Sequence, residues 1–383
     1  MLFGPCAAEA AAFLPASSAL CAGGAGFVTA MMATLAAEAR TAPARTLGKA
    51  IPEVDWLAVR IVTDNVVIQF VPSETRDGFA VERRTAGNTA PDRPPRFALQ
   101  GEWGLAMHAE SKRDGETRNV MVDFGYTPEV LLNNMEVLKV DPSLVDAMVL
   151  SHGHYDHFGG MVGFLKANKG KLKSKLPFYV GGEDTFCIRR NPGGQFGALD
   201  RKAILDADLT LMMAAEPAVV ADHAFTSGRI GQTSFEQPLR ATSEIVGIVD
   251  GFGCFPEKMP AAKNTGQYMP DDFEHELATV YCVKNKGLVV LTSCSHRGVI
   301  NAVRQAMEAS GIDKVHAVIG GFHIVPPLGD DYIKQTIEEF RRIDPDHLLV
   351  GHCTGDRFYD FARAALGDKV IHTAVGTRFV FNS

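Results

Sequence analysis

Four side chains that commonly bind metals lie in one short stretch of this chain, directly after an apolar segment at 146–150. The stretch is 151–157, and the four side chains are His152, His154, Asp156 and His157. Imidazole and carboxylate groups together bind zinc and neighbouring divalent metals. Four such groups at this density favour a metal site over a solvated polar loop, which is the alternative interpretation.

The shape of a tight loop predicts how these ligands are shared. Alternate side chains of a loop after a strand can turn toward one point, and Gly153 gives the backbone freedom to do so. We therefore expect His152 and His154 to face one metal, and Asp156 and His157 to face a second. The expected cofactor is Zn2+, as one or two ions, with Mn2+ or Fe2+ as alternatives.

The pattern His-x-His-x-Asp-His after a strand resembles the signature of the metallo-β-lactamase superfamily. The resemblance covers roughly residues 55–378, because 120–125, 292–298 and 350–355 are similar to further motifs of that family. The sequences around His296, His323 and His352 are also similar to one branch of it. That branch includes the archaeal dihydropterin-methyl-ribofuranosylaminobenzene-phosphate synthase and many uncharacterised hydrolases.

The resemblance implies further site residues, and each has a position that suits its role. His296 and His352 each follow an apolar strand, where α/β proteins gather their functional groups. His296 is expected to complete the first metal site, and His352 the second. Asp123 also ends a strand and is expected to orient a ligand imidazole through a hydrogen bond.

One position departs from the family pattern. Most superfamily members have an aspartate between the last two histidine motifs, and its carboxylate bridges both metals. In this chain the strand at 315–319 leads instead to His323. The branch resemblance implies that His323 is a metal ligand, although an imidazole nitrogen has one lone pair and cannot bridge as a carboxylate does. The alternative is that His323 only supports the site.

Such a site predicts a hydrolase that uses a zinc-activated water or hydroxide. Asp156 is the expected catalytic residue, because it can bind metal and accept a hydrogen bond from the nucleophile. The substrate is expected to be a small molecule that contains an ester, lactone, amide or phosphoester. Two alternatives remain at this stage: a pterin-pathway synthase on the same metal scaffold, and a non-catalytic metal-binding module.

The elements that must position these residues are strands followed by helices in each half of the chain. This order predicts an αββα sandwich over residues 46–383. We expect helices at 128–138, 299–310 and 332–342, strands at 58–64 and 66–71, and a loop at 72–96.

A glycine- and proline-rich insertion is predicted at about 181–272. Its aromatic side chains could hold a flat ring and its arginines an anionic group, although most of them could instead pack the insertion or face solvent. These side chains are Phe186, Arg189, Arg190, Phe196, Phe225, Arg229, Phe252 and Phe255.

Residues 1–45 are rich in alanine and apolar side chains, and no Lys or Arg precedes Arg40. The stretch resembles the apolar core of an export signal, and 37–39 would suit an A-x-A cleavage site. We therefore expect a leader and linker at 1–45 and an exported, periplasmic protein. An uncleaved membrane anchor, an ordinary apolar helix and a cytoplasmic location are the alternatives.

Charge and cysteine content limit the other functions. The formal net charge is −7 and the isoelectric point about 6.0, which argues against nucleic acid as a partner. The seven cysteines are an odd number and form no CxxC pair, which argues against a zinc ribbon. They are expected to be mostly buried free thiols.

Overall fold

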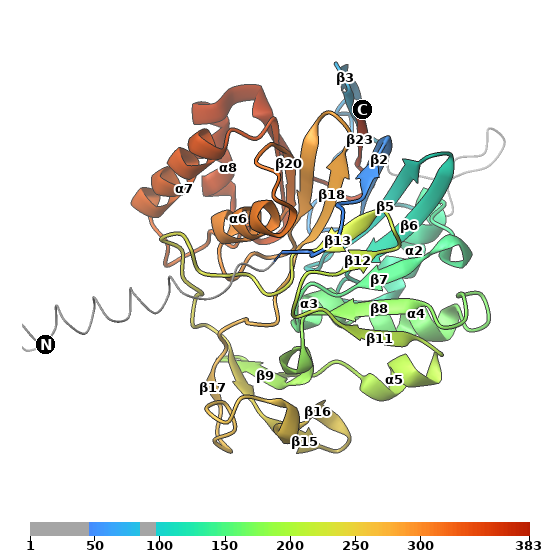
Figure 1. The fold of residues 1–383 in the computed structure, drawn as a ribbon, viewed down its shortest axis with the longest axis vertical. Helices are drawn as coiled ribbons and strands as arrows, with labels where there is room; N and C mark the ends of the chain where they lie inside the picture. Colours follow the sequence, from blue (N-terminus) through green and yellow to red (C-terminus); the bar gives the residue numbers. More distant parts are fainter. Residues whose placement is uncertain (1–45, 85–96) are drawn as a thin grey trace, which may run out of the picture. The chain divides into compact units, whose positions relative to one another are not determined.

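The computed structural model of the 383-residue chain describes residues 46–84 and 97–383. The leader predicted at 1–45 therefore lies outside the described residues. Two mixed sheets are flanked by two groups of helices, as Figure 1 shows, and this confirms the predicted αββα sandwich. In the described part of the chain, no helix is long and apolar enough to cross a membrane.

The first sheet has nine strands, and its middle carries the metal-binding loop. Strands β6, β7, β8 and β11 run parallel to one another, whereas the remaining neighbours are antiparallel. The spatial order is β11 (Thr210–Met213), β8 (Pro177–Val180), β7 (Ala147–Val149), β6 (Glu116–Val122), β5 (Ala106–Arg113), β2 (Trp56–Thr63), β23 (Arg378–Asn382), β4 (Phe79–Glu82) and β3 (Glu74–Arg76).

The second sheet has eight strands. Its strands from β19 to β22 are parallel, so their carboxyl ends lie along one edge. Seven strands follow the order β12 (Val219–Val220), β13 (Ala224–Thr226), β18 (Thr279–Val283), β19 (Gly287–Leu291), β20 (Val315–Gly320), β21 (His347–Val350) and β22 (Val370–His372), and β1 (Glu53–Val54) pairs with β18.

The helices cover the outer faces of both sheets (Figure 1). The nine-stranded sheet packs against α2 (Pro128–Leu138), α4 (Met161–Ala167) and α5 (Arg201–Asp206). The eight-stranded sheet packs against α6 (Val299–Ser310), α7 (Asp330–Ile343) and α8 (Asp356–Leu366). Apolar side chains of both sheets, such as Val59, Tyr281 and Val289, form a fully buried core between them. Removing this apolar surface from water is the main stabilising contribution.

Local signals fix two helices at the predicted bounds. Thr127 caps α2 by accepting a hydrogen bond from the Val130 amide at 3.4 Å, and Pro128 occupies the first turn. Helix α6 ends at Gly311, whose φ of 69° is the left-handed conformation that favours glycine at a helix end. The third predicted helix, at 332–342, lies inside α7.

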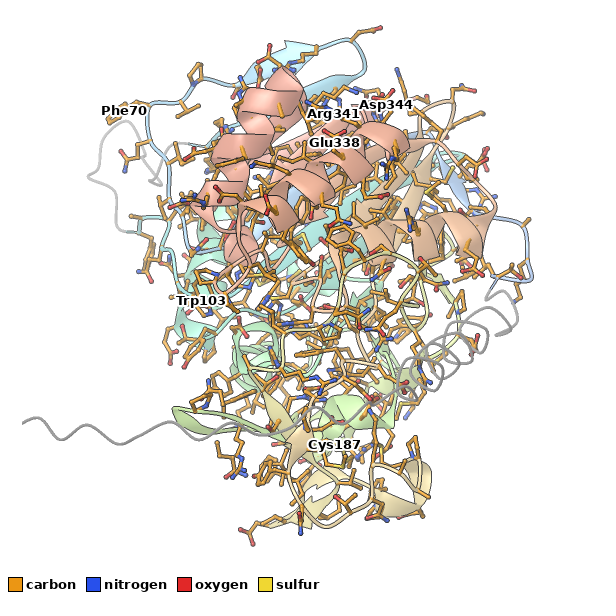
Figure 2. All side chains as sticks on the ribbon, turned by 90° about the vertical axis from the view of Figure 1, so that its left-hand side faces the viewer. Phe70, Trp103, Cys187, Glu338, Arg341 and Asp344 are labelled. Atoms are coloured by element: carbon orange, nitrogen blue, oxygen red, sulfur yellow. A yellow bond between two sulfur atoms is a disulfide. The ribbon has the colours of Figure 1, made fainter. Side chains whose placement is uncertain are left out.

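The predicted strand at 66–71 is wrong, because none of these residues pairs with another strand, and Phe70 is 92% exposed (Figure 2). The prediction of a loop at 72–96 is also wrong in part. That range contains β3 and β4, and β4 pairs with the C-terminal strand β23. A strand whose partner is almost 300 residues away gives no local sign of its pairing.

The range predicted as an insertion contributes to several sheets. Strand β11 belongs to the nine-stranded sheet, and strands β12 and β13 belong to the eight-stranded sheet. A separate sheet is formed by β10 (Gly194–Gly197), β9 (Ile188–Asn191), β14 (Ser243–Ile245) and β17 (Met269–Pro270), and a hairpin by β15 (Gly247–Val249) and β16 (Phe252–Cys254). We call the small sheet and the hairpin together the cap.

A disulfide joins Cys187 to Cys254 within the cap. The prediction of free thiols is therefore wrong for this pair, which the turns of the cap bring together across 67 residues. Three other cysteines, Cys282, Cys294 and Cys353, are buried free thiols.

Candidate metal centre

The chemistry-bearing residues all follow the carboxyl ends of strands in the two main sheets. Asp123 follows β6, the loop with His152 to His157 follows β7, and His296, His323 and His352 follow β19, β20 and β21. Because neighbouring parallel strands end at the same edge of a sheet, residues from distant parts of the sequence meet there. Within this stretch, Asp156 and His157 lie in the short helix α3 (Tyr155–Phe158).

The first group consists of His152, His154 and His296, whose ring nitrogens lie within 4.8 Å of one another. The centroids of their rings are 4.6 to 4.8 Å apart. The Nε2 atom of each ring is buried and has no hydrogen-bond partner. Buried polar atoms are almost always paired, so three unpaired nitrogens that converge can together hold a metal cation.

A hydrogen-bond chain fixes how His152 presents its nitrogen. The Ser151 hydroxyl donates to Asp123 Oδ2 at 2.8 Å, and its oxygen lies 2.9 Å from His152 Nδ1. Since the hydroxyl proton goes to the carboxylate, Nδ1 of His152 must donate to the hydroxyl oxygen. The lone pair of that imidazole is then on Nε2 and faces the first group.

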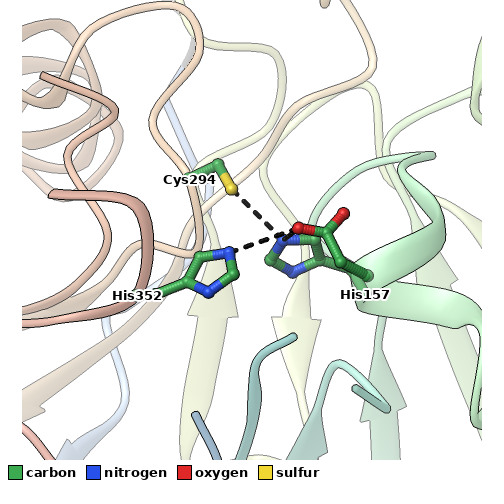
Figure 3. Close-up of side chains that lie close together, drawn as sticks. His157, Cys294 and His352 are labelled. Carbon is green, nitrogen blue, oxygen red and sulfur yellow. Dashed lines mark hydrogen bonds and ion pairs between the residues drawn. The ribbon is translucent and has the colours of Figure 1, made fainter. Parts of the chain in front are cut away.

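The second group consists of Asp156, His157, Cys294 and His352, whose ligand atoms also lie within 4.8 Å of one another. His157 Nε2 lies 3.2 Å from Cys294 Sγ, as Figure 3 shows. Asp156 Oδ2 lies 3.5 Å from Nε2 of both His157 and His352. Sequence reasoning proposed three of these residues for the second metal but did not include Cys294.

The charge balance in the second group favours a cation there. Burial lowers the pKa of His157, but the Asp156 and Asp123 carboxylates outweigh it and raise that pKa to about 10. Asp123 Oδ2 accepts the Nδ1 proton of His157 at 2.8 Å, so the second proton of the ring is the one on Nε2. A metal ion can take the place of this proton, because both are cations stabilised by the same carboxylates.

Sequence reasoning missed two residues that hold His296. The buried Glu276 carboxylate accepts hydrogen bonds from the backbone amides of His296 and Arg297, both at 2.7 Å. The ring of Phe273 stacks on the His296 ring, with centroids 4.1 Å apart. Neither contact has a local sequence signal, because both residues precede His296 by about 20 positions and come from the segment that leads into β18.

Gly153 is required for a different reason from the one predicted. A Cβ atom at this position would lie 2.5 Å from the Thr185 carbonyl oxygen and 2.5 Å from Arg189 Nη1. The metal loop therefore packs directly against the cap, and only a residue without a side chain fits between them.

The comparisons with known proteins agree with this geometry. Residues 113–173, which include the His-x-His-x-Asp-His loop, match the family described as the metallo-beta-lactamase superfamily. The chain has the fold of the metallo-beta-lactamase superfamily. A crystal structure of a metal-dependent hydrolase of the beta-lactamase superfamily covers 84% of this chain and 98% of its own, with a TM-score of 0.60 and 20% identity, which supports the shared fold.

Two proteins of Methanocaldococcus jannaschii are similar to this chain in sequence. One is 7,8-dihydropterin-6-methyl-4-(beta-D-ribofuranosyl)-aminobenzene-5'-phosphate synthase, which is 26% identical over 261 residues, or 66% of this chain and 81% of the relative. The other is the uncharacterized protein MJ0448, which is 23% identical over 282 residues, or 68% of this chain and 86% of the relative.

His323 stands where most members of the superfamily have a bridging aspartate. The structure places it in neither ligand group. Its ring centroid lies 4.2 Å from that of His296, and the side chain lines the pocket above the site. The thiol of Cys294, from the preceding strand end, lies instead among the ligands of the second group.

A pocket of about 350 Å³ opens above both groups in this metallo-beta-lactamase fold. His154 and His296 of the first group line it, as do Asp156 and Cys294 of the second. Of the eight aromatic and arginine side chains of the predicted insertion, Phe196 lines the pocket. Its ring lies 5.4 Å from that of His154.

A third cluster of potential ligands consists of Glu244, on cap strand β14, together with Asp271 and His275. Arg189 lies among these side chains and is fully buried. Its guanidinium donates to Asp271 at 2.6 Å and to Glu244 at 3.0 Å. An arginine thus already supplies the positive charge, and this group is an ion-pair network that supports the cap.

Proposed function

We propose that this chain is a metal-dependent hydrolase with two zinc ions. The observation that carries the proposal is the convergence of two ligand groups at the floor of one open pocket. His152, His154 and His296 would hold one ion, and Asp156, His157, Cys294 and His352 the other. Imidazole nitrogens together with a thiolate favour zinc over Mn2+, which prefers oxygen ligands.

The bound metal would lower the pKa of a coordinated water and polarise a carbonyl or phosphoryl oxygen of the substrate. Asp156 lines the pocket and belongs to the second group, so its carboxylate can also accept a hydrogen bond from a water in the pocket. Asp123 keeps both His152 and His157 in the orientation that ligation needs. The proposed substrate is a small molecule with a hydrolysable bond.

The synthase relative supplies the second candidate function. Its name specifies a product with a 5'-phosphate, and phosphate groups are commonly held by arginine or lysine. Among the described residues that line the pocket, none is Lys or Arg. We therefore favour the hydrolase, and turnover of a hydrolysable substrate in the absence of a second substrate distinguishes the two functions.

The proposal is tested by metal content and activity measured on the same preparations. We expect two zinc ions per chain in the wild type, and loss of the first site in the His152→Ala, His154→Ala double variant. Asp156→Asn should lower kcat roughly ten- to a hundred-fold or more, as expected when a metal shell is damaged. His323→Ala is the control, because it removes a nearby imidazole from outside both groups. Unchanged metal content in the double variant would refute the proposal.

We also propose that the protein is exported. The apolar, alanine-rich residues 1–45 support this, and so does the disulfide between Cys187 and Cys254, because disulfides persist mainly outside the cytoplasm. N-terminal sequencing of protein from the native host should give a start near residue 40. An intact Met1 on cytoplasmic protein would contradict the proposal.

A further inference from the structure

Aromatic side chains form much of the wall of the pocket above the metal centre. Trp103 is 54% exposed and its ring centroid lies 5.3 Å from that of His352. Figure 2 shows Trp103 at the surface of the molecule. Tyr126 and Tyr155 are 43% and 37% exposed, and their rings meet edge to face at 4.9 Å. Large exposed aromatic rings that gather at a pocket commonly mark a surface that a ligand covers.

The inner part of the pocket is also lined by aromatic and aliphatic side chains. Phe196 comes from the cap, Phe273 lies against His296, and Leu239 and Ala241 add aliphatic surface. Apart from the metal-binding groups, the polar side chains that line the pocket include those of Asn191, Thr242, His323 and Cys353, and none of these is Lys, Arg, Asp or Glu. A volume of about 350 Å³ is at the lower end of what small-molecule sites provide.

Arginines that neighbour the pocket wall in sequence are not among its lining residues. Arg240, between Leu239 and Ala241, is exposed, and Arg297 donates to the Asp272 carbonyl oxygen at 2.6 Å. Arg189 is buried in the ion-pair network with Asp271 and Glu244. Arg190 stacks on Tyr268, with its guanidinium carbon 3.9 Å from the ring centroid. No Lys or Arg occurs among the residues that line the pocket, as far as the structure describes the chain. An anionic substrate group would thus have no Lys or Arg partner among the lining residues.

We infer that this pocket takes an uncharged carboxylic ester or lactone with an aromatic or other apolar group, in preference to a phosphate ester or another anionic substrate. The inference rests on the proposed hydrolase function and narrows it. The apolar group of the substrate would pack between Trp103 and the Tyr126–Tyr155 pair, and its carbonyl would lie at the metal centre. Burial of apolar surface then supplies the binding energy.

The first experiment compares substrates that differ in charge. The zinc-loaded protein is given 4-nitrophenyl hexanoate, the mono-4-nitrophenyl ester of adipic acid, and 4-nitrophenyl phosphate. The first two have the same leaving group and nearly the same length, but the adipate carries a terminal carboxylate. We expect kcat/KM to be at least about tenfold higher for the hexanoate than for the adipate, mainly through KM. A higher kcat/KM for the adipate or the phosphate overturns the inference and leaves the hydrolase proposal standing.

The second experiment changes the pocket wall. Ala241→Lys places a cation at an exposed position that lines the pocket, and Ala241→Gln is the neutral control of similar length. The lysine variant should reduce the preference for hexanoate over adipate several-fold, and the glutamine variant should not. Trp103→Ala should raise KM for the hexanoate, whereas Phe252→Ala, which removes an exposed ring away from the pocket, should leave KM unchanged. The inference is contradicted if Ala241→Lys and Ala241→Gln change the substrate preference equally, or if Trp103→Ala and Phe252→Ala change KM equally.

A binding measurement separates the inference from the proposed function if none of these substrates is hydrolysed. N-benzylacetamide is uncharged, carries an aromatic group and is not expected to be cleaved rapidly. Calorimetry should detect its binding to the zinc-loaded wild type and at least tenfold weaker binding to Trp103→Ala. Binding that depends on Trp103 supports the inference even in an inactive protein, whereas absent or Trp103-independent binding refutes it.

Discussion

At the scale of single residues, one carboxylate serves both ligand groups. Asp123 accepts the Nδ1 proton of His157 directly and reaches His152 through the hydroxyl of Ser151. It also accepts the Ser151 amide at 2.8 Å, which fixes the start of the metal loop. Because Asp123 is fully buried, these hydrogen bonds form in a medium of low dielectric and are strong. The two ligand groups thus share a common support.

The thiol of Cys294 is predicted to be a ligand of the second metal. Protein loaded with Co2+ should show the near-ultraviolet charge-transfer absorption of a cobalt–thiolate bond, because a thiolate is a soft ligand for this ion. The band should disappear in Cys294→Ser. Cys353→Ser is the matched control, since Cys353 is also a buried thiol in the pocket wall but belongs to neither ligand group. Retention of the band in Cys294→Ser would show that another thiol, or none, binds the metal.

The sequence indicated most of the candidate site. Its histidines either lie in the His-x-His-x-Asp-His pattern or directly follow an apolar strand. The sequence did not indicate Cys294, which is two residues from His296. The residue between them, Ser295, has a positive φ of 61°. This turn directs the two neighbouring side chains to different ligand groups, and such a local reversal cannot be predicted from residue types alone.

At the scale of elements, the cap and the metal loop are joined by Arg189. All of its guanidinium nitrogens donate, to the side chains of Asp271 and Glu244 and to backbone carbonyls that include those of Thr185 and Cys187. The same guanidinium lies against Gly153. A single buried side chain therefore fixes strand β9 of the cap against the stretch 151–157, which carries four of the proposed ligands.

Arg189→Met is predicted to lower the free energy of unfolding by about 3–5 kcal/mol, because it leaves Asp271 buried without its guanidinium partner and Glu244 paired with Lys263 alone. Urea unfolding at neutral pH measures the loss. Arg190→Met is the matched control in the same strand, since Arg190 is exposed and its replacement should change stability by less than about 0.5 kcal/mol. Similar effects of the two variants would mean that the buried network does not stabilise the cap.

His108 on strand β5 makes the nine-stranded sheet sensitive to acid. Burial, with help from the Arg60 guanidinium, lowers the pKa of His108 from 6.5 to about 4. Between these two pH values the unfolded chain binds more protons at this group than the folded protein does. The stability that the neutral imidazole contributes is therefore complete above pH 6.5 and is lost as the pH falls toward 4.

His108→Gln should remove this part of the acid destabilisation. The free energy of unfolding of the variant, relative to that of the wild type, should rise as the pH falls from 6.5 to 4 and should be constant above 6.5. Urea unfolding at several pH values measures it. Parallel pH curves for the two proteins would show that His108 titrates alike in the folded and unfolded states.

Elements whose signals lie close by in the sequence were predicted, and elements that depend on a partner far away in the sequence were not. Helix α2 was found at its observed bounds, because Thr127 and Pro128 are local start signals. Strand β4 was missed, because β23 pairs with it from the other end of the chain. The segment 66–71 has the composition of a strand, yet no strand lies beside it in the structure. Composition indicates that a segment can form a strand, but only the tertiary fold supplies its partner.

At the scale of the whole molecule, the described residues divide into a sandwich that supplies the metal ligands and a cap that supplies Phe196 to the pocket wall. The sandwich has extensive buried cores between and outside its sheets. The cap has short strands and is held by the buried ion pairs of Arg189 and by the disulfide between Cys187 and Cys254. Covalent and ionic links thus add to the apolar contacts through which Val246 and Cys254 join the buried core beside the nine-stranded sheet.

This division predicts the effect of removing the disulfide. The Cys187→Ser, Cys254→Ser double variant no longer closes a loop of 67 residues in the unfolded chain, so its free energy of unfolding should fall by about 2–4 kcal/mol. Because both metal-binding groups come from the sandwich, the metal content should stay that of the wild type, whereas KM should rise as Phe196 becomes less firmly placed. Unfolding in urea, metal analysis and steady-state kinetics on the same preparations measure the three quantities. Loss of metal with unchanged KM would contradict this division, because it would show that the cap supports the ligands and not the pocket wall.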